Sequence, residues 1–374
     1  DPKAAERFAL KQSQAFVDQM EGFALELEDE LMNFSDVSYK SFVKSESEII
    51  TLFYDKFADI PLLSRMDAVA ETFIDEIETL LNRDLPEEER IPLIEKFRKM
   101  YETMDFYVLY NRFLKKEGYQ TLPRRPLEKR KLRYEDVYPV LYLKYRLSRQ
   151  AERSNIKHLV IDEMQDYSRL QYLIIRRMFS CKMTILGDRA QTMADQQQDV
   201  LQFLPGIFGK DLRRIEMRKS YRNTVEIASY AANLIGVTDL ELFERHGMPV
   251  LERDVTDLEA ALREAVDTLF PDEKTYETAA VIVPDAKTAE RAYLILREIL
   301  AEKDFDCGKR LSWLNRDSSS FKKGLTVTTF YLAKGLEFDQ VFSIFPKDEK
   351  REIMMQAQYI AATRALHELR VYHI

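Results

Sequence analysis

Short apolar segments alternate with helical ones along residues 157–374, and this alternation constrains the fold more than any other feature of the chain. KHLVID (157–162), KMTILGD (182–188) and AAVIV (279–283) are apolar over consecutive positions rather than at every second one. Strands of this kind, separated by helices, form a parallel sheet that is covered on both faces. The same pattern predicts strands over residues 213–217, 325–330, 339–345 and 368–373. We therefore predict two α/β units in series.

The first third of the chain has a different pattern. Apolar residues recur at helical spacing over residues 5–32, 64–83 and 88–118, and Gly118 follows the last run as a stop signal. Almost no strand-like alternation accompanies these runs. The pattern predicts an all-α helical domain in front of the α/β units.

A sharp change of composition separates these parts. Residues 119–133, YQTLPRRPLEKRKLR, combine six Lys and Arg with two prolines, and we call them the basic linker. Two interpretations stay open: a solvated connector, or a contact for phosphate or an acidic partner. The predicted organisation is a helical domain (1–118), the basic linker (119–133), the remainder of a first α/β domain (134–215) and a second α/β domain (216–374).

Charge and cysteine usage exclude several classes of protein. Residues 1–119 carry 15 Lys and Arg against 26 Asp and Glu, a balance of −11, so this part is an unfavourable surface for nucleic acid. No uninterrupted apolar stretch reaches the roughly 18 residues of a membrane span. Cys181 and Cys307 form no CxxC pattern, which argues against a disulfide or zinc scaffold. We expect a cytoplasmic protein without a membrane segment.

Acidic and amide side chains follow two of the predicted strands. Asp162 and Glu163 come directly after the first strand, and Gln191 lies in the turn after the second. Ligands gather at the carboxyl ends of parallel strands. There, one acid can hold the Mg²⁺ of a nucleotide, directly or through water, while its neighbour activates the attacking water. Helix capping and an ordinary turn are the simpler readings of these residues.

Three further strings carry polar residues at the ends of elements. Tyr221 and Arg222 precede a helix, where an aromatic ring can stack on a base and a guanidinium can reach a phosphate. Gly335 and Glu337 lie in a loop after the strand 325–330. Arg364 ends a helix, and an arginine brought to a transferring phosphate stabilises developing charge. Taken singly, each of these three strings is explained equally well by an ordinary structural role: a helix start, a loop or a surface charge.

In this order and spacing the strings DEMQD, GDRAQ, SYRNT, TTFYLAKGLEF and AATRA closely resemble the later motifs of superfamily 1 helicases of the UvrD/Rep kind. The resemblance covers residues 156–374. It implies two RecA-like domains of the phosphate-loop NTPase helicase fold, with ATP and Mg²⁺ as cofactors. It also implies roles for the residues above. In the first domain it implies that Asp162 binds Mg²⁺, that Glu163 activates water and that Gln191 couples the state of the γ-phosphate to motion. In the second domain it implies that Tyr221 stacks on adenine and that Arg222 and Arg364 contact the γ-phosphate. Glu337, beside Gly335, would bind the ribose.

The chain departs from that family in ways that matter. No G-x-x-x-x-G-K-[ST] occurs, so the phosphate loop is missing, and we expect this chain to be the C-terminal portion of a longer protein and inactive alone. The stretch after GDRAQ, residues 192–200, reads TMADQQQDV and offers no base-stacking aromatic residue. Too few residues separate Arg222 from Lys334 for an extra helical domain.

These departures are similar to the HelD branch of the superfamily, bacterial ATPases that bind RNA polymerase and help to release it from nucleic acid. That branch has a helical insertion in its first RecA-like domain, at the position of residues 1–118. The resemblance implies partners of three kinds: nucleic acid, with DNA expected, RNA polymerase, and the missing N-terminal part of the same protein. The alternative is a non-catalytic, helicase-like protein-interaction scaffold.

Overall fold

The computed structural model folds into two compact units, which we describe separately. The first comprises residues 1–187 and 197–212, and the second comprises residues 188–196 and 213–374. The structure describes residues 2–149, 155–188, 191, 200–237, 241–269, 276–302, 310–315, 318, 323–347 and 352–374. Residues 192–199 and Cys307, which entered the predictions above, lie outside the described residues.

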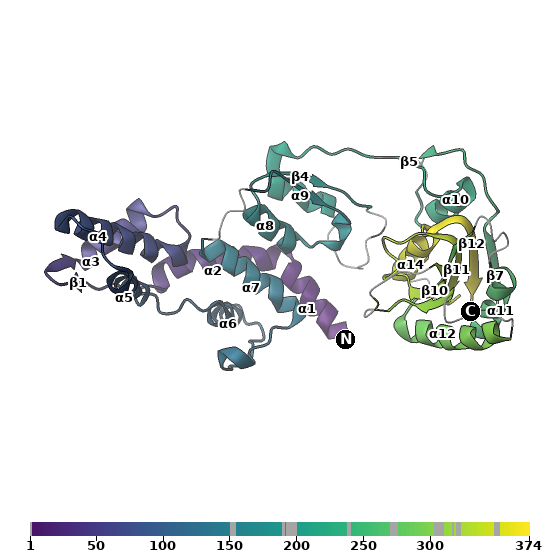
Figure 1. Ribbon diagram of the computed structural model, residues 1–374, viewed down its shortest axis with the longest axis horizontal. Helices are drawn as coiled ribbons and strands as arrows, with labels where there is room; N and C mark the ends of the chain where they lie inside the picture. Colours follow the sequence, from purple (N-terminus) through teal and green to yellow (C-terminus); the bar gives the residue numbers. More distant parts are fainter. Residues whose placement is uncertain are drawn as a thin grey trace. The chain divides into compact units, whose positions relative to one another are not determined.

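Helices build the beginning of the first unit (Figure 1). Their bounds are α1 (Pro2–Gln12), α2 (Gln14–Glu30), α3 (Glu46–Thr51), α4 (Arg65–Leu81), α5 (Glu87–Arg98), α6 (Phe106–Lys116) and α7 (Tyr134–Leu147), with short turns η1 (Leu52–Lys56), η2 (Leu62–Ser64) and η3 (Leu127–Lys129). The predicted run 5–32 is two helices, because the Ser13 side chain accepts the amide of Phe16 and starts α2. The run 88–118 likewise restarts at Asp105, whose side chain accepts the amide of Tyr107.

A small antiparallel hairpin interrupts these helices and was not predicted. Its strands are β1 (Val37–Tyr39) and β2 (Phe42–Lys44), and the turn places Lys40 at a positive φ of 53°. Each strand is three residues long. Such short strands leave no alternation to detect.

One hydrophobic core joins the helices to the start of the α/β part. It runs from Phe16 of α2 through Leu147 of α7 to Leu170 and Ile174 of α8 (Arg169–Met178). Helix α7 packs against α1, α2 and α6 (Figure 1). The helices of residues 1–118 therefore share their core with α7 and α8.

The α/β part of the first unit is a parallel pair of strands, β3 (His158–Ile161) and β4 (Lys182–Ile185). Ile161 of β3 packs with Tyr172 of α8 and with Phe203 of α9 (Val200–Phe208). The short turns η4 (Met164–Asp166) and η6 (Gly209–Asp211) follow β3 and α9. On the other side of the pair, Val160 is 61% exposed.

The second unit is built on a six-stranded sheet in the order β7-β12-β11-β8-β10-β9, in which every pairing is parallel. The strands are β7 (Leu251–Asp254), β8 (Thr278–Val283), β9 (Leu311–Trp313), β10 (Gly324–Thr329), β11 (Phe338–Phe345) and β12 (Ala365–His373). Helices α10 (Val225–Leu234), α11 (Leu258–Asp267), α12 (Ala286–Ala301) and α14 (Glu352–Ala362) accompany it. A short parallel pair, β5 (Lys219–Ser220) and β6 (Glu241–Leu242), completes the described strands.

Alternate residues of β8 enter two different cores. Ala279 and Val281 pack in the cluster that contains α11 and α12, whereas Ala280 and Ile282 pack in the cluster that contains α10 and α14. Both faces of the sheet are therefore covered, as the apolar pattern predicted. The predicted RecA-like α/β fold with a preceding helical region is confirmed. One predicted strand is wrong, because residues 213–217 form no strand and both Ile215 and Met217 are exposed.

In the part of the chain that the structure describes, no helix has the length and apolar character needed to cross a membrane.

Candidate functional site

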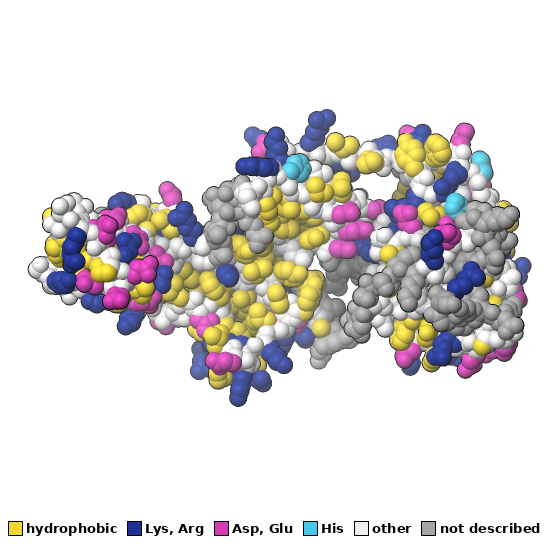
Figure 2. All heavy atoms as spheres, viewed as in Figure 1, with side chains coloured by type: hydrophobic (Ala, Val, Ile, Leu, Met, Phe, Trp, Pro, Cys, Tyr) yellow, Lys and Arg dark blue, Asp and Glu magenta, His cyan; other side chains and the backbone are white. Residues whose placement is uncertain are grey.

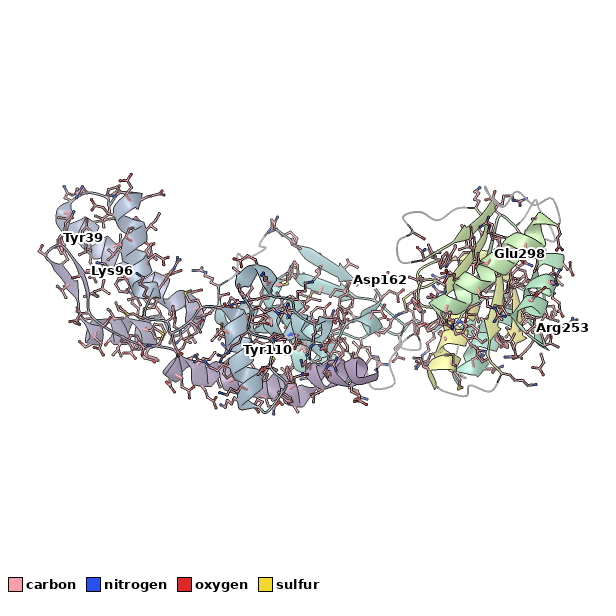
Figure 3. All side chains as sticks on the ribbon, turned by 90° about the horizontal axis from the view of Figure 1, so that it is seen from below. Tyr39, Lys96, Tyr110, Asp162, Arg253 and Glu298 are labelled. Carbon is pink, nitrogen blue, oxygen red and sulfur yellow. The ribbon has the colours of Figure 1, made fainter. Side chains whose placement is uncertain are left out.

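The acidic loop of the first unit begins where β3 ends (Figure 3, labelled at Asp162). Asp162 is exposed, and its Oδ1 accepts the amide hydrogen of Glu163 at 2.8 Å. Glu163 has φ 52° and ψ 51°, a left-handed conformation that costs a residue other than glycine about 1–3 kcal/mol. The buried side chain of Gln165 donates to Glu163 Oε2. The loop therefore holds two neighbouring carboxylates in a fixed and locally strained arrangement.

The end of β4 fixes this loop from the other side. Leu186 accepts the amide hydrogen of Met164 at 2.8 Å and donates its own to the carbonyl of Ile161, also at 2.8 Å. Gly187 then passes so close that a Cβ there would lie 2.6 Å from the backbone nitrogen of Met164. The glycine of GDRAQ is thus required by the acidic loop beside it.

Asp188 and Gln191 belong to the second unit. Asp188 Oδ2 accepts hydrogen bonds from Gln191 Nε2 and from the hydroxyl of Tyr359 in α14, each at 3.0 Å. Burial, together with the charge of Asp188, raises the pKa of Tyr359, so this hydroxyl stays protonated and donates. Gln191 Oε1 is buried and has no hydrogen-bond partner among the described residues. An acceptor in that state fits a group that orients a donor such as water.

An exposed aromatic ring and an ion pair lie next to each other before α10. Tyr221 is 61% exposed, and its ring centroid lies 5.6 Å from that of Phe243. The following residue, Arg222, places its Nε 2.7 Å from Oε1 of Glu337, and both side chains are about half-exposed. Two motifs that are far apart in the sequence therefore meet at one solvent-facing position of the second unit.

Backbone contacts hold this position. Thr224 caps α10 by accepting the amide of Ile227, while Asn223 Nδ2 donates to the carbonyls of Thr363 and Ala365 at 3.3 and 2.7 Å. These bonds join the start of α10 to the start of β12. Thr224, rather than Asn223, is therefore the residue that caps α10.

Arg364 lies inside the second unit and is 2% exposed. Its Nε donates to the carbonyl of Ile360 at 3.2 Å, and its other nitrogens donate to the carbonyl of Leu336 and to Oγ1 of Thr363. Gly335, at a left-handed φ of 77°, precedes Leu336 and Glu337 in the same loop. The structure thus ties Arg364 to the loop of Gly335 and Glu337, but it does not project the guanidinium into solvent.

Two residues of this region escaped the sequence analysis. Phe243 contacts Tyr221, and Arg245 donates to the carbonyls of Arg222 and Leu366. Neither stands in a motif. An isolated aromatic residue with a basic residue two positions later carries no signal that separates it from an ordinary loop.

The donor set for Mg²⁺ is small. Among the described residues, no group of three or more His, Cys, Asp and Glu is arranged to hold a metal ion. Mg²⁺ in nucleotide sites is bound by one or two carboxylates and otherwise by phosphates and water. Asp162 and Glu163 fit this mode, since Asp162 uses only Oδ1 in the local hydrogen bond.

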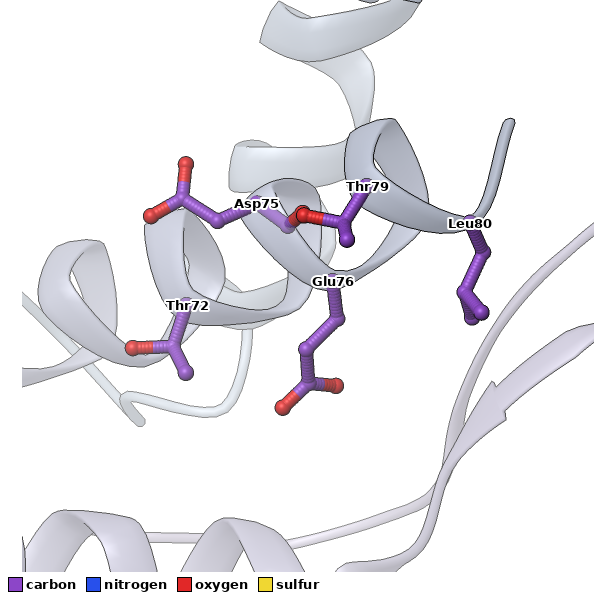
Figure 4. A pocket seen from close by; sticks show the side chains of 5 residues that line it. All are labelled: Thr72, Asp75, Glu76, Thr79 and Leu80. Atoms are coloured by element: carbon purple, nitrogen blue, oxygen red, sulfur yellow. The ribbon is translucent and has the colours of Figure 1, made fainter. Parts of the chain in front are cut away.

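A surface hollow of the first unit lies away from these motifs. It has a volume of about 440 Å³ and lies along α4, between the side chains of Thr72, Asp75, Glu76, Thr79 and Leu80 (Figure 4). None of its lining residues belongs to the motifs described above.

Residues 6–193 match the family described as the UvrD/REP helicase N-terminal domain. This match spans half of the chain, so the protein belongs to the UvrD/Rep helicase family. Family membership was predicted from residues 156–374, and the match extends it to the helical region. The search of curated proteins found no match.

Three solved structures are similar to the chain. The C-terminal domain of a possible DNA helicase from Lactobacillus plantarum WCFS1 has 24% identity and a TM-score of 0.33, over 41% of this chain and 88% of that one. The helicase of PRRSV has 15% identity and a TM-score of 0.32, over 71% and 45%. The arterivirus nonstructural protein 10 helicase, solved with DNA, has 14% identity and a TM-score of 0.32, over 71% and 51%. The chain thus spans about half the length of the two viral helicases.

Proposed function

We propose that this chain is part of an ATP-driven, helicase-like motor that remodels nucleic acid, or a complex of RNA polymerase with nucleic acid. One observation carries the proposal. Arg222 and Glu337, which the resemblance assigns to one nucleotide, come from distant segments and lie 2.7 Å apart at the surface. Beside them, Tyr221 presents an exposed ring.

In the first unit, the proposed chemistry belongs to the acidic loop. Asp162 holds Mg²⁺, directly or through water, and this ion would neutralise charge on the phosphates when bound. Glu163 accepts a proton from the attacking water, and the hydrogen bond from Gln165 orients its carboxylate. Gln191, which belongs to the second unit, uses its unpaired Oε1 to sense whether the γ-phosphate is present.

In the second unit, the proposed role of Tyr221 is to stack on adenine, with Glu337 and Gly335 at the ribose. Arg222 turns from Glu337 to the γ-phosphate. The ion pair is half-exposed and contributes only about 0–1 kcal/mol, so a phosphate can displace it. Arg364 needs a larger change, because it must leave the carbonyls of Ile360 and Leu336.

We propose that sequence outside this chain supplies a phosphate loop, and that the β3–β4 pair receives it. Val160 of β3 and Leu186 beyond β4 are 61% and 45% exposed, although both are apolar. Parallel sheets are normally covered on both faces. We therefore expect the missing N-terminal part of the protein to pack here, and the chain alone to lack ATPase activity.

The finer target that we propose is RNA polymerase bound to nucleic acid. The support is the acidic balance of residues 1–119, which complements a basic channel and repels DNA phosphates. Because these helices share a core with α7 and α8, deleting them would disrupt the first unit as well. A charge-reversal variant at the exposed Glu87 and Glu88 tests the surface instead. Capture of polymerase should fall with this variant.

The matched control for that capture experiment reverses the exposed Glu290 and Glu298 of α12 in the second unit. It introduces the same change of charge away from the acidic helices. Equal loss of polymerase with both variants would reject the proposed surface.

ATPase activity of the full-length protein tests the motor itself. We expect turnover to disappear in Glu163→Gln and to persist in Glu88→Gln, which makes the same chemical change at an exposed position. Turnover should rise with single-stranded DNA or with RNA polymerase. Absence of turnover under every condition would favour the scaffold, whereas turnover by residues 1–374 alone would refute the requirement for a separate phosphate loop.

A further inference from the structure

We propose that the basic linker and the start of α7 form a contact site for single-stranded nucleic acid, outside the helicase motifs. The linker presents Arg124, Arg125, Lys129 and Lys131 to solvent. No side chain of these four has a hydrogen bond or ion pair with a described residue. Figure 2 shows Lys and Arg side chains gathered at the lower edge of this region, where Figure 1 draws the turn that follows α6. Unpaired, clustered cations are the usual footprint of a phosphate contact.

The linker is held at its beginning. Leu122 is buried, and its amide donates to Oδ1 of Asn111 at 2.7 Å. The hydroxyl of Tyr107 donates to the carbonyl of Pro123 at 2.6 Å. Both partners belong to α6. The chain therefore enters the cationic segment from a fixed point rather than as a free connector.

Two arginines of the linker are used internally. Arg130 pairs through Nη1 with Asp105, donates through Nε to the carbonyl of Arg125 at 3.0 Å, and lies 4.8 Å from the ring centroid of Tyr107. Arg133 donates to Oε1 of Gln120 at 3.0 Å. These bonds stabilise the conformation of the linker. The side chains of the four other cations remain exposed to solvent and unpaired among the described residues.

Apolar groups lie among the cations. Leu127 is 73% exposed, and Tyr134, the first residue of α7, is 66% exposed. The ring of Tyr134 stacks on Phe8 with centroids 5.5 Å apart and planes 19° apart, which fixes its orientation. A fixed, accessible aromatic ring beside a cationic track is the arrangement on which unpaired bases stack.

The acids that follow Tyr134 do not oppose a phosphate. Glu135 is buried and pairs with Arg7 at 2.7 Å, and Asp136 is fully buried and pairs with Lys11. Burial, the largest single influence, would by itself raise the pKa of Glu135, but the hydrogen bond from Arg7, a backbone hydrogen bond and the charges of Arg7 and Lys11 together outweigh it and lower the pKa. Both negative charges are compensated beneath the surface, so Glu128 is the one exposed acid of residues 119–136, against the four exposed cations of the linker.

These features favour single-stranded nucleic acid over an acidic polypeptide. Acidic side chains need only the cations, whereas the stacked Tyr134 and the exposed Leu127 offer apolar surface to bases. This inference deepens the proposed function and rests on it only in taking nucleic acid as the partner. It also supplies a stacking position that the stretch after GDRAQ lacks.

The test is fluorescence anisotropy with the full chain and labelled dT or U oligonucleotides of about 20 nucleotides, longer than common single-domain sites. The linker variant replaces Arg124, Arg125, Lys129 and Lys131 by alanine. Each lost phosphate contact lowers the slope of log K against log salt by about 0.7, so the slope should fall by about 3. Between about 50 and 200 mM salt, the wild-type affinity should then drop about 50-fold more than that of the variant.

A second variant tests stacking separately from charge. Tyr134→Ala should lower affinity about fivefold or more, with an unchanged salt slope. The matched control replaces the exposed Lys56, Arg83, Lys99 and Lys115 by alanine, which makes the same change of charge elsewhere in the first unit. Its salt slope should stay at the wild-type value. The linker variant should stay folded, since its four cations have no described partners, and circular dichroism checks the fold of all three variants.

Three results would overturn the inference. The first is an equal change of slope in the linker variant and the control. The second is a linker variant that no longer binds poly-glutamate but binds oligonucleotides as the wild type does, which would assign the site to an acidic polypeptide. The third is absence of oligonucleotide binding by the wild-type chain. The proposed motor function is tested separately, because the ATPase comparison at Glu163 does not involve the linker.

Discussion

Replacing Gly187 by alanine should separate the end of β4 from the acidic loop. A Cβ at this position would lie 2.4 Å from Cγ of Met164, 2.5 Å from Oε1 of Gln165 and 2.6 Å from the backbone nitrogen of Met164. The two side chains can turn aside. The backbone nitrogen cannot move without stretching its 2.8 Å hydrogen bond to the carbonyl of Leu186.

The expected loss of stability follows from these contacts. Overpacking of a tight site costs about 1–3 kcal/mol, and one weakened backbone hydrogen bond adds about 1 kcal/mol. The free energy of unfolding of the first unit should therefore fall by about 2–4 kcal/mol. For a unit of this size that corresponds to a lowering of the melting temperature by roughly 10 °C.

The assay can distinguish the two units because the chain has a single tryptophan, Trp313 in β9 of the second unit. Tryptophan fluorescence therefore reports unfolding of the second unit, while circular dichroism is dominated by the many helices of the first. In Gly187→Ala the transition seen by circular dichroism should shift to lower temperature. The transition seen by fluorescence should stay in place.

The control is Gly22→Ala in the same unit. Gly22 lies in the interior of α2, is exposed, and has no atom within 4 Å of an added Cβ. Alanine should raise stability there by about 0.5–1 kcal/mol, because glycine is a poor helix former. Equal melting temperatures for Gly187→Ala and the wild type would refute the close approach that we describe.

Further predictions concern both units. Lys11→Met should lower the free energy of unfolding by about 3–5 kcal/mol, because it leaves the charge of Asp136 buried and uncompensated. Chemical denaturation monitored by circular dichroism measures this loss, and the additional substitution Asp136→Leu should restore most of it. Hydrogen bonds, above all from His246, lower the pKa of Glu226 from 4.5 to about 2, so its stabilisation is complete above pH 4.5 and is lost as the pH falls towards 2. Glu226→Gln should flatten this part of the pH profile of the fluorescence-detected urea midpoint. Gly324→Ala should destabilise the second unit by about 2–4 kcal/mol in the same fluorescence assay, since φ is 113° and the Cβ would lie 2.2 Å from a backbone oxygen; an unchanged midpoint would contradict that strain.

The sequence predicts the central strands well because their residues are buried on both faces. β8 is apolar at consecutive positions from Ala279 to Val283, which solvent-facing strands are not, whereas β11 is buried almost throughout although it contains Gln340 and Ser343. The same reasoning fails for residues 213–217, where apolar side chains stand in solvent and no neighbouring strand pairs with them. It also misses the hairpin β1–β2, whose strands are too short to establish a period.

The candidate site is predictable residue by residue but not in its contacts. The order of the motifs identifies Asp162, Glu163 and Arg222 from the sequence alone. The pairing of Arg222 with Glu337 depends on how β11 and α10 are placed in the unit, and no local pattern encodes it. The burial of Arg364 likewise depends on backbone carbonyls contributed by a distant loop.

The continuous core of the first unit has a mechanical consequence. Helix α8 starts just after the acidic loop, and it contributes Leu170 to the core shared with the helices and Tyr172 to the core under β3. A load applied to the helical region is therefore passed to β3, the strand that precedes Asp162. The 17 residues of α2 extend this path by about 25 Å. Under force the first unit should therefore transmit load as one stiff body and unfold in a single step, rather than as a helical domain that moves independently of the α/β part.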